Sequence, residues 1–590
     1  MKKFLFCFIP TSITHCPEMS IPALTAQLRY HNYDVSVMDL NIDFFNQIFS
    51  REYLDNAVIN AQKKYESLKL KKEDFYCKDD SYKNEILTQK YNELENFFQN
   101  YTEVAKKVPL SIDKALKILK NEELFYNPKL LSFACSVINY AKKIACLQYA
   151  PFDFYFTYET YFDDLLKIVF DKEKNIFWDY FEKKVLEIKE KNIDFIGISI
   201  SYRQQIIAGL TFAYLLKKHT SAHINLGGNY FSRLTEYIPN YIDFFEKFFD
   251  SVSYGEGENS IIELAKYIDG EIDISEVPQL IYKDKKNGKI KKTPMGMTVV
   301  LSKIPAPDYS DYDFEKYLLP ERVLPIQVQR GCYWNKCAFC ESAFEKTPSV
   351  KTVEQLIKEI RQYNEKYNVS TFMIIDETIT PKYLDKFSDA IINENLNFKF
   401  MMSLRLEKKV TCDLLSKMYK AGFRSFWFGF ETASERVLKL INKGVTVEES
   451  IQVLKTSNEI GFLNNVYCLV NFPTSTYQDD LSTFKFVKES SDIVHNILYT
   501  EFMLTNNSKI YNNPSEYGLE IIEDIKNSRV SLEFDFKRKV GMTDEEQKDI
   551  AAMYSKYYWK ERFQHIVAPY YMTLYCNKFG LNFVKENLLK

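Results

Sequence analysis

The sequence has no long hydrophobic run. The apolar stretch that follows Lys2 and Lys3 ends after six residues at Pro10, which is too short for the core of a secretory signal. No other segment approaches the roughly 20 apolar residues of a membrane span. The net charge is only −3, which gives no electrostatic case for nucleic acid or an anionic membrane. We therefore expect a cytoplasmic protein with no nucleic-acid and no membrane partner.

Histidine is scarce, and nucleotide-binding glycine patterns are missing. The six histidines are scattered, so we assign none of them to a metal. No G-x-G-x-x-G or Walker pattern follows a predicted strand, which disfavours a nucleotide-phosphate site. Eleven cysteines in an intracellular chain of this size do not indicate a disulfide framework. A tight group of cysteines would instead indicate a metal or catalytic site.

The 590 residues are too many for one compact core, so we expect about two to four domains. A strand, a helix and a strand over 2–41 begin a parallel α/β unit. The pattern resumes at 193–202 with the apolar strand "IDFIGISISY", as parallel sheets require. Between them, residues 49–185 show helical apolar spacing, as in "KALKILKNEELF". This predicts a Rossmann-like domain over 1–300 that contains a helical insertion.

A second α/β series begins at 323, after polar stretches at 283–293 and 305–313 that we interpret as a linker. Helical patterns separate six strand-like segments: "VLPIQVQ", "TFMIID", "FKFMMSLR", "SFWFGFE", "NVYCLVN" and "DIVHNILYTEF". Such alternation predicts a partial (β/α)6 TIM-type barrel over 301–502, so the fold class is α/β. Weaker periodicity over 503–590 predicts a mostly helical C-terminal region.

Three cysteines, Cys332, Cys337 and Cys340, lie within nine residues directly after the first barrel strand. A zinc site commonly has four ligands in two pairs, and only one pair, "CAFC", is present here. The alternative is a chance group of structural cysteines, but three thiols on one short loop that contains glycine are poorly placed for burial. Thiolates are the normal ligands of iron–sulfur clusters, and three of them leave one iron of a four-iron cluster open. The spacing therefore favours an iron–sulfur cluster.

The segment "RGCYWNKCAFC" resembles the signature of the radical S-adenosylmethionine (SAM) enzymes, in the form found in members with an N-terminal cobalamin-binding domain. Four residues, rather than the common three, separate Cys332 from Cys337. The resemblance implies that the three cysteines hold a 4Fe–4S cluster whose open iron binds SAM. Electron transfer would then cleave SAM to a 5′-deoxyadenosyl radical. It also implies an external electron donor such as flavodoxin or ferredoxin.

Polar residues end the predicted barrel strands and should gather on one rim. These residues are Asp376, Glu377, Arg405, Glu431 and Asn471. The resemblance implies that Asp376 and Glu377 bind the amino group of SAM, Arg405 its carboxylate, and Glu431 its methionyl or ribose part, while Phe339 contacts adenine. Guanidinium suits a carboxylate because it binds in a bidentate way. Alternatively, Arg405 pairs with Glu431 or Asp376, and Phe339 is a core residue.

Three turns of the first domain carry small residues that the resemblance places along the nucleotide tail of cobalamin. They are Ser199, Ser201, Gly227, Gly228 and Gly255. Ordinary α/β packing explains the same glycines, and a domain that no longer binds cobalamin is also compatible. We expect a large side chain at Gly228 to block the tail. The loop that holds His15 lacks an Asp-x-His-x-x-Gly motif, so no protein imidazole should reach cobalt.

These observations favour cobalamin-dependent methylation of an unactivated carbon in a peptide or small-molecule substrate. A second hypothesis is radical SAM oxidation, cyclisation or epimerisation without methyl transfer. A third is a non-catalytic iron–sulfur or cobalamin sensor, although a sensor needs no polar rim. The insertion at 49–185 and the region after 503 are the parts best placed to contact substrate, because both lie outside the shared scaffold. The sequence assigns no catalytic residue.

Overall fold

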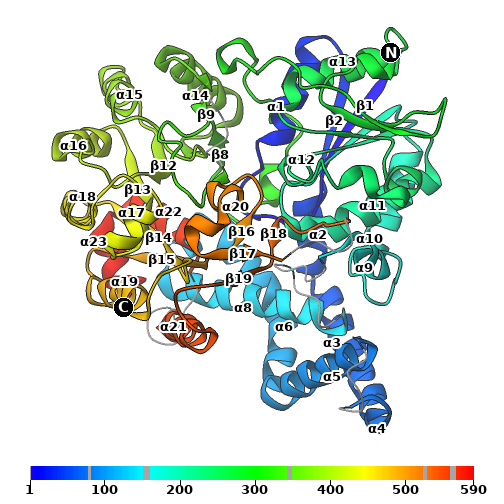
Figure 1. The fold of residues 1–590 in the computed structure, drawn as a ribbon, viewed down its shortest axis with the longest axis horizontal. Helices are drawn as coiled ribbons and strands as arrows, with labels where there is room; N and C mark the ends of the chain where they lie inside the picture. Colours follow the sequence, from blue (N-terminus) through cyan, green and yellow to red (C-terminus); the bar gives the residue numbers. More distant parts are fainter. Residues whose placement is uncertain are drawn as a thin grey trace. The chain divides into compact units, whose positions relative to one another are not determined.

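The computed structural model describes residues 2–76, 82–149, 154, 160–341, 349–522, 528–557 and 567–589. The chain divides into two compact units (Figure 1). The first unit comprises residues 1–299, 304–320 and 525–531, and the second comprises residues 300–303, 321–524 and 532–590.

The first unit contains a seven-stranded sheet with the order β2-β1-β3-β4-β5-β6-β7. Its strands are β1 (Lys3–Phe8), β2 (Asp34–Asp39), β3 (Phe195–Ser199), β4 (His223–Gly227), β5 (Ser251–Ser253), β6 (Leu280–Lys283) and β7 (Ile290–Lys292). The first five strands pair in parallel. The order 2-1-3-4-5 is that of flavodoxin-like folds, in which ligands bind beyond the carboxyl ends of β1 and β3.

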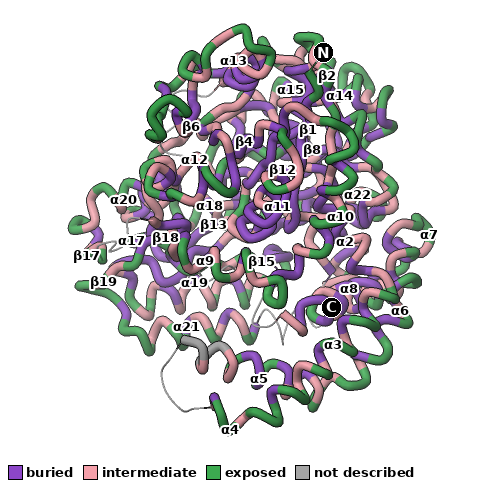
Figure 2. The backbone as a smooth tube through the Cα atoms, turned by 90° about the vertical axis from the view of Figure 1, so that its right-hand side faces the viewer, coloured by how far each residue is buried: buried purple, intermediate pink, exposed green. Residues whose placement is uncertain are grey.

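Both faces of this sheet are covered, which explains why β1 and β3 are apolar at nearly every position. Phe4, Phe6 and Phe8 of β1 join one core cluster with residues of α1 (Ser20–Tyr30) and α13 (Gly257–Asp269). Helix α11 (Ile206–His219) is buried at ten of its fourteen positions (Figure 2). The predicted Rossmann-like parallel sheet is therefore confirmed.

The predicted insertion over 49–185 is helical in its described residues. After α2 (Leu40–Ile48), it contains α3 (Arg51–Leu70), α4 (Lys72–Phe75), α5 (Tyr82–Asn100), α6 (Thr102–Lys120), α7 (Glu122–Phe125), α8 (Pro128–Cys146), the short η1 (Leu147–Tyr149), α9 (Phe162–Val169) and most of α10 (Trp178–Lys189). Helix α3 packs against α5, α6 and α8, so these long helices form one bundle.

One helix in the described part of the chain, over Pro128–Tyr149, is long and apolar enough to cross a membrane by length and composition. The sequence analysis missed it because Lys142 and Lys143 interrupt the apolar run. Just over half of its most apolar window, 56%, is buried within the fold. Its contacts with α3 and α6 give that apolar surface a partner inside the bundle.

The polar stretch at 283–293, interpreted above as a linker, forms structure instead. Strands β6 and β7 make an antiparallel hairpin, and β6 pairs antiparallel with β5. Lysines mark β7 because it is an exposed edge strand, where charge prevents further pairing. The second proposed linker segment is bound to the first unit, because Arg29 forms ion pairs with Asp308 at 2.7 Å and Asp311 at 2.8 Å.

The second unit contains a six-stranded parallel sheet with the order β15-β14-β13-β12-β11-β8, which confirms the predicted partial barrel. The strands are β8 (Val323–Ile326), β11 (Thr371–Ile374), β12 (Lys399–Leu404), β13 (Phe423–Glu431), β14 (Leu463–Val470) and β15 (Asn496–Glu501). The helices that follow them are α14 (Val353–Tyr367), α15 (Pro381–Asn393), α16 (Cys412–Lys420), α17 (Glu435–Leu440), α18 (Val447–Ile460) and α19 (Tyr477–Glu489). Figure 1 shows α14, α15, α16 and α18 along the outer side of these strands.

Threonine and serine start most of the barrel helices. Thr352, Thr446 and Thr476 each form a capping box with the residue three positions later. Each hydroxyl accepts a backbone N–H that the first helical turn leaves unpaired, which fixes where the helix begins. The starts of these helices are therefore set by local sequence.

The C-terminal region is mostly helical, with two small strand pairs that the sequence analysis did not anticipate. The pairs are β16 (Leu504–Thr505) with β18 (Glu533–Phe534), and β17 (Leu519–Ile521) with β19 (Phe536–Arg538). The helices are α20 (Lys509–Asn512), α21 (Asp544–Lys556), α22 (Pro569–Phe579) and α23 (Leu581–Asn587). Residues 528–531 belong to the first unit, where the Tyr230 hydroxyl donates to the Val530 carbonyl at 2.8 Å.

Candidate cofactor site

The cysteine loop begins where β8 ends, and Asp376 holds its first residues. The carboxylate of Asp376 accepts the Val328 N–H at 3.0 Å and also accepts the Gln329 N–H. Gln329 and Arg330 form β9, which pairs antiparallel with β10 (Ser349–Val350). Asp376 is buried, and burial raises its pKa to about 7 although the two N–H donors oppose the shift. We infer that Asp376 positions the loop.

Within the loop, Cys337 is buried, while Cys332 and Cys340 are half-buried. Burial raises the pKa of the Cys337 thiol, although the charges of Lys443 and Arg405 act in the opposite direction. The described residues hold no group of three His, Cys, Asp or Glu side chains close enough for a single metal ion. A 4Fe–4S cluster binds each thiolate at a different iron and so needs no such tight group. The three thiols are the ligand type that such a cluster requires.

Three consecutive backbone carbonyls after α17 hold the cysteine loop and Arg405. The Ile441 carbonyl accepts the Ala338 N–H at 2.8 Å, and the Asn442 carbonyl accepts the Trp334 indole N–H at 2.9 Å. The Lys443 carbonyl accepts the Arg405 guanidinium at 2.6 Å. The loop is thus fixed to the carboxyl end of the barrel sheet by main-chain groups of one short segment.

Arg405 is buried and lies against the cysteine loop. Its guanidinium carbon is 4.6 Å from the centre of the Trp334 ring, and Nε is 3.4 Å from a Glu407 carboxylate oxygen. Within the described residues it forms no ion pair with Glu431 or Asp376, which were the alternative partners. Phe339 is half-buried, so it is not a core residue.

Glu431 ends β13 and pairs with a lysine that the sequence analysis did not select. Lys443 Nζ donates to Glu431 Oε1 at 2.5 Å, and both side chains are buried. Burial lowers the pKa of Lys443, but the charges of Glu431 and Cys337 outweigh this, so the pKa is raised. The lysine stands in the segment "GFETASERVLKLINKG", but its twelve-residue separation from Glu431 conceals the contact.

The remaining two rim residues differ in their surroundings. Glu377 is exposed, next to the buried Asp376. Asn471 is buried at the end of β14, where its side-chain amide donates to Glu501 at 3.1 Å and its N–H donates to Asp480 at 2.6 Å. The Asn471 Oδ1 atom is buried with no hydrogen-bond donor among the described residues. A buried carbonyl oxygen of this kind is costly unless a ligand donates to it.

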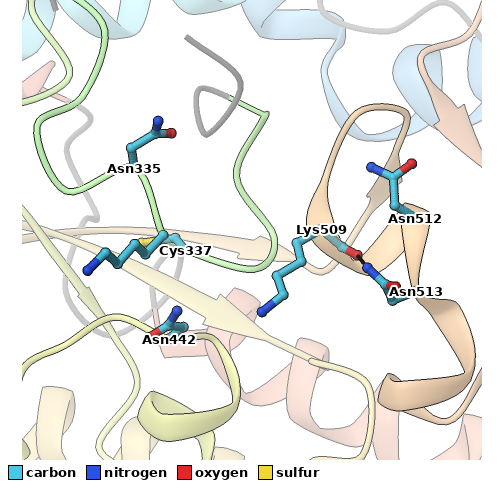
Figure 3. Close-up of a pocket in the computed structure, with 7 residues that line it drawn as sticks. Asn335, Cys337, Asn442, Lys509, Asn512 and Asn513 are labelled. Carbon is cyan, nitrogen blue, oxygen red and sulfur yellow. Dashed lines mark hydrogen bonds between the residues drawn. The ribbon is translucent and has the colours of Figure 1, made fainter. Parts of the chain in front are cut away.

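A cavity of about 390 Å³ adjoins Cys337 (Figure 3). Figure 3 shows Asn335 and Cys337 of the cysteine loop on one side and Lys509, Asn512 and Asn513 of the α20 region on the other. The Ile510 N–H donates to the Ala338 carbonyl at 3.1 Å, which ties α20 to the loop. In the described part of the chain, the lining residues are four asparagines, two lysines and Cys337, with no carboxylate among them.

The turns of the first unit meet at the carboxyl ends of β1, β3 and β4. The Ile200 N–H donates to the Gly227 carbonyl at 2.9 Å. Ser232 joins the next two turns, because its hydroxyl donates to the Gly228 carbonyl at 3.0 Å and accepts the Gly255 N–H at 3.1 Å. The predicted turns therefore share one edge of the sheet.

Serine hydroxyls line this edge at the point where the strand order reverses. Ser199 Oγ lies 3.4 Å from Ser201 Oγ and 3.5 Å from Ser20 Oγ. Nearby, the Glu18 carboxylate accepts the hydroxyls of Ser12 at 2.9 Å and Tyr202 at 3.2 Å. Such a polar edge beyond β1 and β3 is where this strand order binds ligands.

The two adjacent glycines have different roles, which corrects the expectation for Gly228. A Cβ at Gly228 would lie 2.3 Å from the Ile200 carbonyl oxygen, and its φ is +106°. The residue is glycine because the backbone of the neighbouring turn is too close, whether or not a ligand binds. A Cβ at Gly227 would meet no atom within 4 Å, so Gly227 faces open space. Gly227 is therefore the better probe of a bound nucleotide tail.

Comparison with known proteins identifies the second unit. The Radical SAM superfamily matches residues 326–487, which run from the last residue of β8 into α19 and leave β15 outside the match. The chain therefore carries a radical SAM domain, and the resemblance stated from the cysteine spacing is confirmed. This match also confirms the predicted 4Fe–4S cluster and SAM as the cofactors of the domain.

Two curated relatives carry names of different kinds, one of a methyltransferase and one of a cyclase. The uncharacterized methyltransferase PH0819 of Pyrococcus horikoshii is 30% identical over 251 residues, which are 41% of this chain and 53% of the relative. The anaerobic magnesium-protoporphyrin IX monomethyl ester cyclase of Rubrivivax gelatinosus is 24% identical over 263 residues, which are 42% of this chain and 47% of the relative. The chain thus spans about half the length of each.

Two solved structures share the fold. The radical SAM methyltransferase TsrM from Kitasatospora setae, with cobalamin and a [4Fe-4S] cluster bound, matches with a TM-score of 0.51 and 13% identity over 64% of this chain and 82% of its own. The cobalamin-dependent radical SAM enzyme OxsB, with aqua-cobalamin and SAM bound, matches with a TM-score of 0.50 and 17% identity over 63% and 59% of the two chains. At these identities the likeness concerns the fold.

Proposed function

We propose that this protein is a radical SAM enzyme that uses cobalamin to methylate an unactivated carbon of its substrate. One observation carries the proposal: a loop with three thiols is fixed to the carboxyl end of a partial barrel beside Arg405 and Glu431. A bound 4Fe–4S cluster supplies the electron that cleaves SAM. The chain's own residues bind and orient the reactants and exclude side reactions.

Arg405, Glu431 and Asn471 are the residues we assign to SAM. Arg405 is held by the Lys443 carbonyl and by Trp334, so its remaining donors have a fixed direction. This arrangement suits the carboxylate of SAM. The Asn471 Oδ1 atom lacks a donor among the described residues, and the amino group of SAM is a donor. Asp376 acts on the loop instead, since both of its carboxylate oxygens accept backbone N–H groups.

We place the nucleotide tail of cobalamin along Ser199, Ser201, Gly227 and the turn at Gly255. The support is the strand order, the row of hydroxyls beyond β3 and the open space in front of Gly227. TsrM and OxsB, which have this fold, are solved with cobalamin bound. When bound, cobalamin supplies methyl transfer, which is why a methylase combines it with a radical SAM domain.

The cavity beside Cys337 is where we place a polar part of a small-molecule or peptide substrate. Its volume of about 390 Å³ lies within the usual range for small-molecule sites. One wall comes from Lys509, Asn512 and Asn513, which lie beyond the residues shared with the Radical SAM superfamily. This agrees with the expectation that the region after 503 contacts substrate. The electron would come from an external carrier such as flavodoxin or ferredoxin.

The second candidate function is radical SAM chemistry without methyl transfer. The relative from Rubrivivax gelatinosus favours it, because that protein is named as a cyclase. Both functions use the same cluster and SAM site, so the barrel alone does not separate them.

Product analysis separates the two candidates. Anaerobically reconstituted protein, loaded with iron, sulfide and cobalamin, is incubated with SAM, a reductant and a panel of candidate substrates. Methylation yields 5′-deoxyadenosine together with S-adenosylhomocysteine and a methylated product. The second function yields 5′-deoxyadenosine and a product without added carbon. Intact SAM after reduction of an assembled cluster would contradict both and leave the sensor hypothesis.

A further inference from the structure

Lys443 is a buried lysine that lies at the centre of the candidate cofactor site. Its side chain is 9% exposed, and its ammonium group donates to Glu431 Oε1 at 2.5 Å. A buried ammonium is costly unless it is paired, and removing one partner of a buried pair leaves an uncompensated charge. The pair lies at the end of β13, beside the segment whose carbonyls hold Arg405 and the cysteine loop.

Gly429 makes room for this pair. A Cβ at this position would lie 2.5 Å from Lys443 Nζ and 2.7 Å from Glu431 Oε1. Any side chain at position 429 would therefore displace the ammonium group, the carboxylate or both. The glycine of the Gly429-Phe430-Glu431 segment is explained by the space that the ion pair occupies.

The backbone of Glu431 also departs from ordinary strand geometry. Its φ is +64°, in the left-handed region, and the pairing of β13 with β14 shifts register between Gly429 and Glu431. A non-glycine residue in this region is strained, and such residues persist where the surroundings fix them. The Lys443 ammonium group holds the Glu431 side chain in the direction that this backbone conformation gives it.

The main chain of Lys443 reaches a second candidate ligand of SAM. Its carbonyl accepts the Arg405 guanidinium at 2.6 Å, while its side chain holds Glu431. The two preceding carbonyls, of Ile441 and Asn442, hold the cysteine loop. One short segment, residues 441–443, therefore contacts the cysteine loop, Arg405 and Glu431 together.

We propose that the Lys443 side chain is a positioning group for SAM, which sets the Glu431 carboxylate against Gly429, while the backbone carbonyl of the same residue anchors Arg405. The proposal rests on the proposed function, because it takes Arg405 and Glu431 as contacts of SAM. It adds Lys443 and Gly429 as residues that act through those contacts.

A double-mutant cycle on reconstituted full-length protein tests this role. The variants are Lys443→Met, Glu431→Gln and the two combined, with the exposed Lys439→Met of α17 as a matched control. Equilibrium dialysis gives the dissociation constant for SAM, and iron and sulfide analysis gives the cluster content. We expect each single variant to weaken SAM binding tenfold or more with the cluster retained. The dissociation constant of the combined variant for SAM should be at most about threefold higher than that of the single variant that binds SAM less tightly, since Lys443 acts through Glu431.

Gly429→Ala provides an independent test that removes neither charge. Its Cβ would displace the pair, so it should weaken SAM binding as Lys443→Met does, while Lys439→Met should bind as the wild type does. If Lys443→Met fails to fold, the combined variant, which leaves no unpaired buried charge, and Gly429→Ala still decide the matter.

Three results would overturn the role of Lys443: wild-type affinity in Lys443→Met, wild-type affinity in both Gly429→Ala and the combined variant, or losses that multiply in the combined variant. Failure of the proposed function looks different. In that case the wild-type protein would assemble its cluster and bind no SAM, whatever the variants do.

Discussion

The adjacent glycines Gly227 and Gly228 should respond in opposite ways to the same substitution. Alanine at 228 places a Cβ 2.3–2.7 Å from three backbone atoms of Ile200, at a φ of +106°. A left-handed backbone costs about 1–2 kcal/mol for a non-glycine residue. Overpacking against atoms that cannot rotate away adds about 1–3 kcal/mol. Gly228→Ala should therefore destabilise the first unit by about 2–5 kcal/mol.

Gly227→Ala should be nearly neutral, within about 0.5 kcal/mol, because its Cβ meets no atom within 4 Å. Thermal unfolding of the cobalamin-free protein, followed by calorimetry, compares the two. Gly228→Ala should lower the midpoint of the first unit by at least roughly 4 °C, and Gly227→Ala should leave it unchanged. Equal midpoints for Gly228→Ala and wild type would refute the steric reasoning.

A larger side chain at position 227 tests the ligand itself. Gly227→Leu should fold normally, because it extends into open space, yet it should lose cobalamin if the nucleotide tail lies there. Absorbance of the reconstituted protein gives the cobalamin bound per chain, and iron analysis confirms that the cluster is intact. Full retention of cobalamin by Gly227→Leu would remove the cofactor from this turn.

Further predictions concern single residues. Arg405→Ala should retain the cluster and weaken SAM binding by about 2–5 kcal/mol, with partial recovery in Arg405→Lys, which lacks the planar fork; unchanged affinity would make Arg405 structural. Burial raises the pKa of Asp376 to about 7, so the folded protein keeps a proton that the unfolded chain loses near pH 4. The stabilisation from this proton falls as pH rises from about 4 to about 7. The thermal unfolding midpoint of the wild type, minus that of Asp376→Asn, should therefore decrease from pH 5 to pH 8, and a difference that stays constant would contradict the pKa shift. His15→Ala should leave the absorbance spectrum of bound cobalamin unchanged, whereas a changed spectrum would indicate that His15 reaches cobalt.

The repeating parts of the fold could be predicted from the sequence. Six apolar strands separated by helical patterns define the barrel, and threonine caps mark where its helices begin. The cysteine spacing was sufficient to favour an iron–sulfur cluster, because three thiols in one short loop are typical of such ligation. The radical SAM domain was indicated by the resemblance of the whole segment "RGCYWNKCAFC" to that family's signature. Both patterns lie within short segments, so they can be recognised in the sequence without knowledge of tertiary contacts.

The features that the sequence analysis missed depend on contacts between distant residues. Lys443 reaches Glu431 only because α17 turns the chain back over the end of β13. The hydrogen bonds by which the Asp376 carboxylate accepts backbone N–H groups of the neighbouring loop cross 48 and 47 residues of sequence. The lysines of β7 suggest a linker because an edge strand needs charge more than hydrophobicity.

The measurement that tests the central claim most directly is cluster assembly and SAM cleavage in a triple variant. Cys332, Cys337 and Cys340 are replaced together by Ala, and a Cys412→Ala protein, which removes an exposed cysteine outside the loop, is reconstituted in parallel. Iron, sulfide and 5′-deoxyadenosine are then measured after anaerobic reduction with SAM. The account predicts a full cluster and 5′-deoxyadenosine in the control and neither in the triple variant. A triple variant that keeps its full complement of cluster iron would contradict it.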